Sequence, residues 1–414
     1  MHALTALRHP NFAWFIGGQL VALVGYWMQQ IALTWLVYRL TGSVMLLGVL
    51  GFAANLPVLL LAPWAGLWAD RVNRHRAMLA VQVLEMLQAV ALATLAVTGL
   101  IEVWHVIALA ALMGVFVAVE LPVRHAYLLE LVGRREEIPK AVAVTSLMAN
   151  CGRLAGPAIG GLVIAGAGES VCFVLNALSY VAVLVSFAFI RPHPQAVSDS
   201  HPPLLRGMHE GLAYVWNTLP IRALLMLLAV LSIFVASYGT LMPAVVKEVF
   251  DGGAETLGFM VSAAGFGALA ATLVLAARRS VRGLTGTIVA AAAAAGAALV
   301  VVALSRNVWV SLALMAVVGF SILVVNVSVN MILQTIVDDD KRGRVMSLYT
   351  TAFLGMAPVG ALVAGSLAQA IGAAHTLLAG GAVCVAAAAA MWRYLPRLKA
   401  FVRPIYDRLG ITHR

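Results

Sequence analysis

Continuous apolar runs are the feature that most constrains how this chain can fold. Twelve of them occur in 414 residues. Each is roughly 20 residues or longer, the length that a helix needs to cross a bilayer. Charged residues make up only 11% of the chain, whereas a soluble domain carries about 25%. The runs do not alternate with polar residues, which excludes a membrane β-barrel. The sequence therefore predicts an all-α membrane protein with twelve transmembrane helices.

These runs fall into two groups of six. We expect spans at 11–38, 44–69, 77–99, 103–128, 138–165, 171–190, 221–246, 257–277, 284–304, 308–336, 345–371 and 376–395. After the sixth span comes a proline-rich polar segment. Apolar residues at spacings of three and four follow this segment, and they predict an amphipathic helix on the membrane surface. These residues are Leu204, Leu205, Met208, Leu212, Val215 and Trp216. The predicted units are an N-terminal six-helix bundle at 1–191, a cytoplasmic linker at 192–219, a C-terminal six-helix bundle at 220–396 and a cytoplasmic tail at 397–414.

The basic residues give the chain a net charge of +10 and predict its orientation. With both termini in the cytoplasm, all but four of the 27 Lys and Arg residues fall on the cytoplasmic side. The exceptions are Arg39, Lys247 and Arg306, with Arg153 inside a span. Lysine and arginine are retained on the cytoplasmic side of membranes. The positive charge therefore reflects topology and does not indicate a nucleic-acid partner.

The sequence contains no motif for a catalytic or metal-binding site. Cys151, Cys172 and Cys384 all lie in apolar runs, which predicts buried thiols without a disulfide. No cysteine pair has the spacing of a metal site, and no phosphate-binding loop for ATP is present. We expect no enzymatic activity and no cofactor.

A weak repeat relates the two groups of spans. The fifth span contains the segment GRLAGPAIGGLVIAGAG, which is weakly similar to LGMAPVGALVAGSLAQAIG in the eleventh span. Pro157 and Pro358 occupy corresponding positions in the two segments. Parallel repeats of this kind place a substrate site between the halves, near the bilayer midplane. The sequence therefore predicts two pseudo-symmetric six-helix bundles.

The turn GLWADRVNRHR, at 66–76, joins the second and third spans. It resembles the loop G-x-x-x-D-R-x-G-R-R between helices 2 and 3 of the major facilitator superfamily, with matches at Gly66, Asp70, Arg71 and Arg74. It departs from that pattern at two positions, Asn73 and His75. We expect Asn73 to adopt the positive φ of the glycine that it replaces. The resemblance implies a gate in which Asp70 contacts Arg74 or the start of the eleventh span, near Arg342 and Arg344.

Small residues in the fifth span form a second motif, consisting of Gly152, Gly156, Pro157, Gly160 and Gly161. Ordinary helix packing explains part of such a run, since small residues let neighbouring backbones approach and proline kinks the helix. With the turn also present, it resembles the helix 5 motif of drug–proton antiporters. We expect Gly156 to lie at the contact between the halves.

The resemblance extends over nearly the whole chain, to the enterobactin-exporter-like branch of this superfamily, which also contains macrolide-efflux proteins. It is carried by WMQQIALTWLVYRLTGS, ELVGRREEIPKAVAVTSL and DDDKRGRVMSLYTTAFLGMAPVGALVAG. It implies the major facilitator fold, export coupled to protons, and a bacterial inner membrane. One departure is Tyr26, which stands where members commonly have an acidic residue.

Polar residues inside the spans are the candidates for a site, because each is costly in hydrocarbon. The resemblance implies that helices 1, 4, 7 and 10 line the substrate cavity. The candidate cavity residues are Tyr26, Gln29, Gln30, Asn55, Asn326, Asn330 and Gln334. Interhelical hydrogen bonding is the alternative role for the amides among them.

Proton coupling is assigned to Glu120, with Arg153 as its expected partner and Glu85 as the second candidate. Glu120 and Arg153 both lie inside predicted spans, and a charged side chain inside a membrane needs a partner. The alternative is a local pair between Glu120 and Arg124, four residues apart, although Pro122 between them should distort that geometry.

These observations favour a monomeric, proton-coupled exporter of a siderophore-like or drug-like amphipathic molecule. Its partners would be that molecule, protons and the bilayer. A lysophospholipid flippase is the alternative. A non-transporting receptor is disfavoured, because the packing motifs for moving halves are intact.

Overall fold

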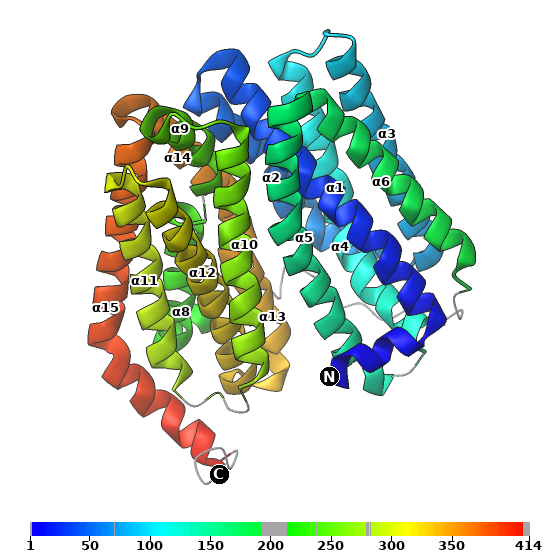
Figure 1. The fold of residues 1–414 in the computed structure, drawn as a ribbon. Helices are drawn as coiled ribbons and strands as arrows, with labels where there is room; N and C mark the ends of the chain where they lie inside the picture. The colour runs from blue at the N-terminus through cyan, green and yellow to red at the C-terminus, as the bar shows by residue number, and fades with distance from the viewer. Residues whose placement is uncertain are drawn as a thin grey trace.

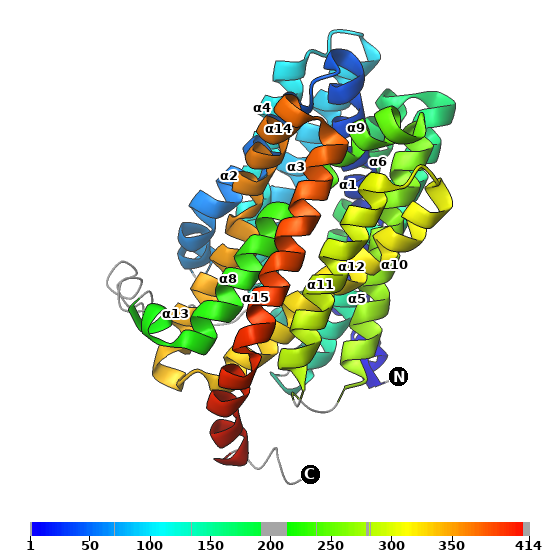
Figure 2. The same ribbon diagram turned by 90° about the vertical axis from the view of Figure 1, so that its left-hand side faces the viewer.

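The structure is a computed structural model that describes residues 2–69, 71–133, 135–191, 213–236, 238–278, 281 and 283–408. Within these ranges, twelve helices are long and apolar enough to cross a membrane, as predicted. They form two six-span bundles side by side (Figure 1). The first residues of the chain and the end of the last helix lie at the same end of the molecule, the terminal end, in both Figure 1 and Figure 2. The opposite end is called the distal end.

The helices of the first bundle are α1 (Pro10–Thr41), α2 (Val44–Ala69), α3 (Arg74–Val97), α4 (Val103–Val132), α5 (Ile138–Ala167) and α6 (Glu169–Phe189), with the short helices η1 (His2–Arg8) and η2 (Arg135–Glu137). Those of the second are α8 (Leu219–Phe234), α9 (Tyr238–Phe250), α10 (Ala254–Ala276), α11 (Leu284–Leu304), α12 (Val308–Ile336), α13 (Asp339–Thr350), η3 (Thr351–Gly355), α14 (Ala357–Ile371) and α15 (Ala373–Arg408). Most of the predicted linker and amphipathic helix lies outside the described residues, although 213–217 is helical.

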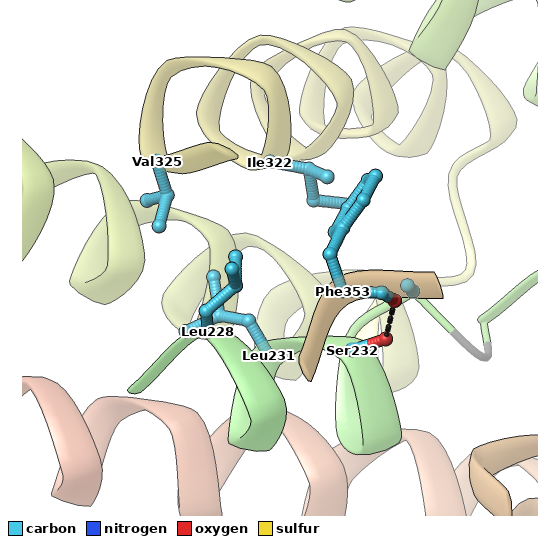
Figure 3. A pocket seen from close by; sticks show the side chains of 7 residues that line it. Leu228, Leu231, Ser232, Ile322, Val325 and Phe353 are labelled. Atoms are coloured by element: carbon cyan, nitrogen blue, oxygen red, sulfur yellow. Dashed lines mark hydrogen bonds between the residues drawn. The ribbon is translucent and has the colours of Figure 1, made fainter. Parts of the chain in front are cut away.

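Two spans that were predicted as single helices are broken. The seventh consists of α8 and α9, and the eleventh of α13, the π-helical segment η3 and α14. Pro358 is the second residue of α14, and its missing N–H prevents a regular helix from continuing through this point. The two breaks meet where the Ser232 hydroxyl donates to the Phe353 carbonyl at 2.5 Å. Figure 3 shows this bond beside a small apolar cavity lined by Leu228, Leu231, Ser232, Ala236, Ile322, Val325 and Phe353.

The halves meet along two helix pairs, α5 with α10 and α2 with α14. Each pair crosses at two glycines. A Cβ added to Gly161 would lie 3.0 Å from the Gly258 Cα, and one added to Gly48 would lie 3.0 Å from the Gly365 Cα. Only glycine permits so close an approach of two backbones. The fifth and eleventh spans therefore play equivalent parts in the two halves.

Gly156 does not lie at the contact between the halves. A Cβ there would lie 2.9 Å from the Val24 carbonyl of α1, within the same bundle, and one on Gly160 would lie 3.0 Å from the Met28 Cα. Of the predicted motif, Gly161 and the Pro157 carbonyl face α10. The expectation for Gly156 was wrong because helix periodicity turns Gly156 and Gly161 to different neighbours.

Asn73 also differs from expectation. Its φ is −66°, and its side chain accepts a hydrogen bond from the Arg76 backbone N–H at 2.9 Å, so it is the N-cap of α3. Asparagine is among the best N-cap residues, which explains its place here without a positive φ.

We expect Asn73→Ala to lower the free energy of unfolding by about 1 kcal/mol, because one N–H at the helix start loses its partner. Equilibrium unfolding of the protein in mixed micelles measures the change. Asn73→Asp keeps the cap and serves as the matched control. Wild-type stability for the alanine variant would show that the cap contributes nothing.

Candidate functional site

A cluster of charged side chains is buried between α3 and α4. Glu85 is 3% exposed and Glu120 is 6% exposed. The Gln82 Nε2 donates to Glu85 at 3.1 Å and to Glu120 at 3.0 Å. Since both carboxylates contact one nitrogen, they are near neighbours. Arg124 donates to Glu120 in an i, i+4 ion pair.

The cluster holds two carboxylates and one guanidinium. Arg124 neutralises Glu120, while the Glu85 Oε1 has no hydrogen-bond partner among the described residues. A charge without compensation is costly inside a membrane, and two adjacent carboxylates do not readily ionise together. The cluster is electrically neutral only when one carboxyl group carries a proton. It can therefore hold one exchangeable proton.

The expected pairing of Glu120 with Arg153 was wrong. Helix α4 continues through Pro122, so Glu120 and Arg124 remain on one face and form the local pair. The Arg153 guanidinium instead lies over the Trp27 ring, 5.1 Å from its centroid.

Arg153 belongs to an exposed row on α5, here called the exposed stripe, made of Val142, Ser146, Ala149 and Arg153. The stripe lies between the glycine face that packs on α1 and the face that packs on α10, where Asn150 donates to Thr272 at 3.0 Å. Ile159 and Leu162, on the other side of the helix, are exposed as lipid-facing residues are. The stripe therefore faces the interior of the molecule. It begins near the terminal end and stops at Arg153, beyond which Gly156 and Pro157 are buried.

Tyr26 lies near both the buried cluster of carboxylates and Arg153. It is half-buried on α1 and interacts electrostatically with Glu85, with Glu120 and with Arg153. Tyr180 of α6 also interacts with these two carboxylates.

The polar amides divide into two networks. Gln29 is fully buried, donates to Gln88 at 3.3 Å and accepts from Asn176 at 2.8 Å. It joins helices of the first bundle and does not line a cavity, because its hydrogen-bonding groups are already satisfied there. Gln30 is half-buried on the same helix.

In the second bundle the three predicted residues of α12 are close together. Gln334 donates to Asn330 at 2.6 Å, and the Tyr349 hydroxyl donates to the Asn326 Oδ1 at 2.9 Å. Tyr349, on α13, was not among the predicted residues. Asn55 of α2 is exposed, and its amide bonds the Gly51 carbonyl of its own helix at 2.8 Å.

The described gating candidates near the start of α3 and in α13 lie at the terminal end. Asp70 lies outside the described residues. Arg74 donates to Glu130 of α4 at 3.1 Å, a partner that the sequence did not suggest. Arg71 and Arg342 are exposed, whereas Gly66 and Arg344 are half-buried. Nearby, a hydrogen bond from His9 lowers the pKa of Glu137.

Comparisons with known proteins agree with this architecture. The family model described as "Transmembrane secretion effector" matches residues 1–404. The chain is 28% identical to the multidrug efflux pump Tap of Mycolicibacterium fortuitum, over 87% of this chain and 90% of the relative. It is 27% identical to the staphyloferrin A transporter of Staphylococcus aureus, over 88% and 91%.

Solved structures share the fold at low sequence identity. A bacterial homologue of the human lysosomal transporter Spinster matches with a TM-score of 0.72 and 14% identity, over 95% of this chain and 98% of that one. The nucleoside transporter NupG matches with a TM-score of 0.71 and 12% identity, over 95% and 99%. The match along nearly the whole chain, together with two pseudo-symmetric bundles, shows that this protein belongs to the transmembrane secretion effector family of major facilitator transporters.

Proposed function

We propose that this protein exports an amphipathic small molecule across the bacterial inner membrane in exchange for protons, as a monomer that alternates between two conformations. The observation that carries the proposal is Glu85, a buried carboxylate beside a second one that is already paired with the guanidinium of the cluster. Relatives named for drug efflux and for transport of staphyloferrin A support export of an amphipathic molecule.

In this mechanism Glu85 carries the proton and Arg124 keeps Glu120 ionised. Binding of a proton neutralises the cluster, and its release restores a net negative charge between α3 and α4. A change of charge then shifts the balance between the two conformations.

The exposure pattern supports a conformation open at the terminal end. The exposed stripe runs from that end to Arg153, while the glycine contacts at Gly161 and Gly48 close the distal end. The distribution of Lys and Arg supports a cytoplasmic terminal end. The bound molecule would therefore enter from the cytoplasm.

Everted membrane vesicles test proton coupling. After respiration has acidified the vesicle lumen, adding a macrolide or metal-free staphyloferrin A should release protons, measured as recovery of a quenched pH dye. Vesicles without the protein give the baseline, and an ionophore that collapses the gradient should stop uptake of the added compound. Movement of a lysophospholipid that ignores the gradient, with no proton release by either compound, would favour a flippase and overturn the proposal.

A further inference from the structure

We propose that Arg153 and Trp27 form the part of the binding site that receives an anionic group attached to a flat ring, so that the exported molecule is an organic anion. The direction of transport rests on the proposed function, whereas the binding site rests on the position and contacts of Arg153.

Arg153 lies midway along α5, where a charged side chain is costly unless it has a partner or faces water. No ion pair or hydrogen bond of its guanidinium occurs among the described residues. It is exposed at the inner end of the exposed stripe. A positive charge in this position is compensated when an anion enters from the terminal end.

The guanidinium lies over the Trp27 ring at 5.1 Å. The cation–π attraction holds the guanidinium near the indole, and its N–H groups remain available for a carboxylate, which arginine binds in a bidentate manner. A flat ring attached to that carboxylate can pack beside the indole, as aromatic rings do.

Tyr26 of α1 and Tyr238 of α9 are both half-buried and both interact electrostatically with Arg153. Tyr238 belongs to the second bundle, and a Cβ on Gly265 of α10 would lie 2.6 Å from the Arg153 carbonyl, so Arg153 lies where the two halves meet. Both acidic side chains of the buried cluster lie on α3 and α4, and one is already paired with Arg124. A cationic ligand at this position would be repelled by the positive charge of Arg153, which disfavours it.

Equilibrium binding to the purified protein tests the site without any proton gradient. The probes are naphthoate, its uncharged isostere naphthamide, and naphthylmethylamine, which is a cation at neutral pH. We expect wild-type protein to bind naphthoate at least about tenfold more tightly than naphthamide, the ratio for one charge-assisted interaction. Isothermal titration in nanodiscs measures the three dissociation constants.

Variants assign the preference to Arg153. In Arg153→Gln the preference for naphthoate over naphthamide should fall to about twofold or less, whereas Arg153→Lys should keep part of it because the charge remains. The matched control is Arg222→Gln. The Arg222 guanidinium also lies over a tryptophan ring, 5.3 Å from the centroid of Trp216, but Arg222 is near the start of α8. That variant should keep the wild-type preference.

The outcomes separate this inference from the proposed function. Equal binding of the three probes, tighter binding of the cation, or binding of none by wild-type protein overturns the anion site. So does an unchanged preference in Arg153→Gln. Anion-selective binding without proton release in everted vesicles would support the site while contradicting proton-coupled export.

Discussion

Glu85→Gln is expected to abolish proton-driven transport while leaving exchange of the transported molecule across the membrane intact. Glutamine resembles the protonated carboxyl group and cannot release a proton, so the cycle that couples transport to the gradient is interrupted. Exchange needs only the movement of the loaded protein, and it should become independent of pH. Both activities are measured in proteoliposomes, with and without a pH gradient, using whichever compound releases protons in vesicles.

Glu130→Gln is the matched control for this prediction. Glu130 is also a buried carboxylate that is paired with an arginine, Arg74, but it lies apart from the cluster on α4. Its substitution should leave the dependence on the gradient in place. If Glu120→Gln uncouples transport and Glu85→Gln does not, then Glu120 carries the proton. If neither does, the cluster is structural.

Gly161→Leu is expected to lower transport by about a hundredfold or more, because the larger side chain overpacks the crossing and holds the halves apart at the distal end. Even a single Cβ there would lie 2.6 Å from the Ala254 carbonyl and 3.0 Å from the Gly258 Cα, and backbone atoms cannot move aside as a side chain can. Gly365→Leu, at the equivalent crossing of α14 with α2, should have the same effect. Uptake into everted vesicles measures the loss.

A control lies five residues further along the same helix. A Cβ on Gly166 would meet nothing within 4 Å, so Gly166→Leu should transport normally. Gly161→Ala separates a transport defect from misfolding, because it should lower the rate while the protein remains monodisperse. Wild-type transport by Gly161→Leu would remove this contact from the mechanism.

Sequence reasoning predicted the twelve spans and the two bundles because hydrophobic length is a local property. The breaks between α8 and α9 and at η3 were missed, since they depend on how two spans meet, as the Ser232 bond to Phe353 shows. The turn at Asn73 was also misread, because one residue can serve either as a cap or as a positive-φ position.

The site was harder to predict than the fold. Glu85 and Glu120 were both identified from their depth, but the partner of Glu120 was not, because choosing between Arg124 and Arg153 requires the rotation of α4 relative to α5. Gln82 was missed although a signal existed: it stands three residues before Glu85, so both lie on one helix face in an otherwise apolar span. Arg153 was correctly singled out as a charge needing a partner, but Trp27 was not expected beside it.

The glycine crossings have a mechanical consequence. Ile138, at the terminal end of α5, is 23 residues from Gly161, which at 1.5 Å per residue is a lever of about 34 Å, while Ala167 is only about 9 Å beyond it. A rotation about this crossing moves the terminal end by about 0.6 Å per degree and the distal end by roughly a quarter of that, given the same helix rise. A fixed pivot would therefore open a wide entrance and a narrow exit.

A Cβ on Gly265 of α10 would lie 2.6 Å from the Arg153 carbonyl, so a second close contact between α5 and α10 exists nearer the middle of α5. If contact at Gly161 is released while contact at Gly265 persists, the helices roll on one another, the two arms become nearly equal, and the exit opens as far as the entrance did.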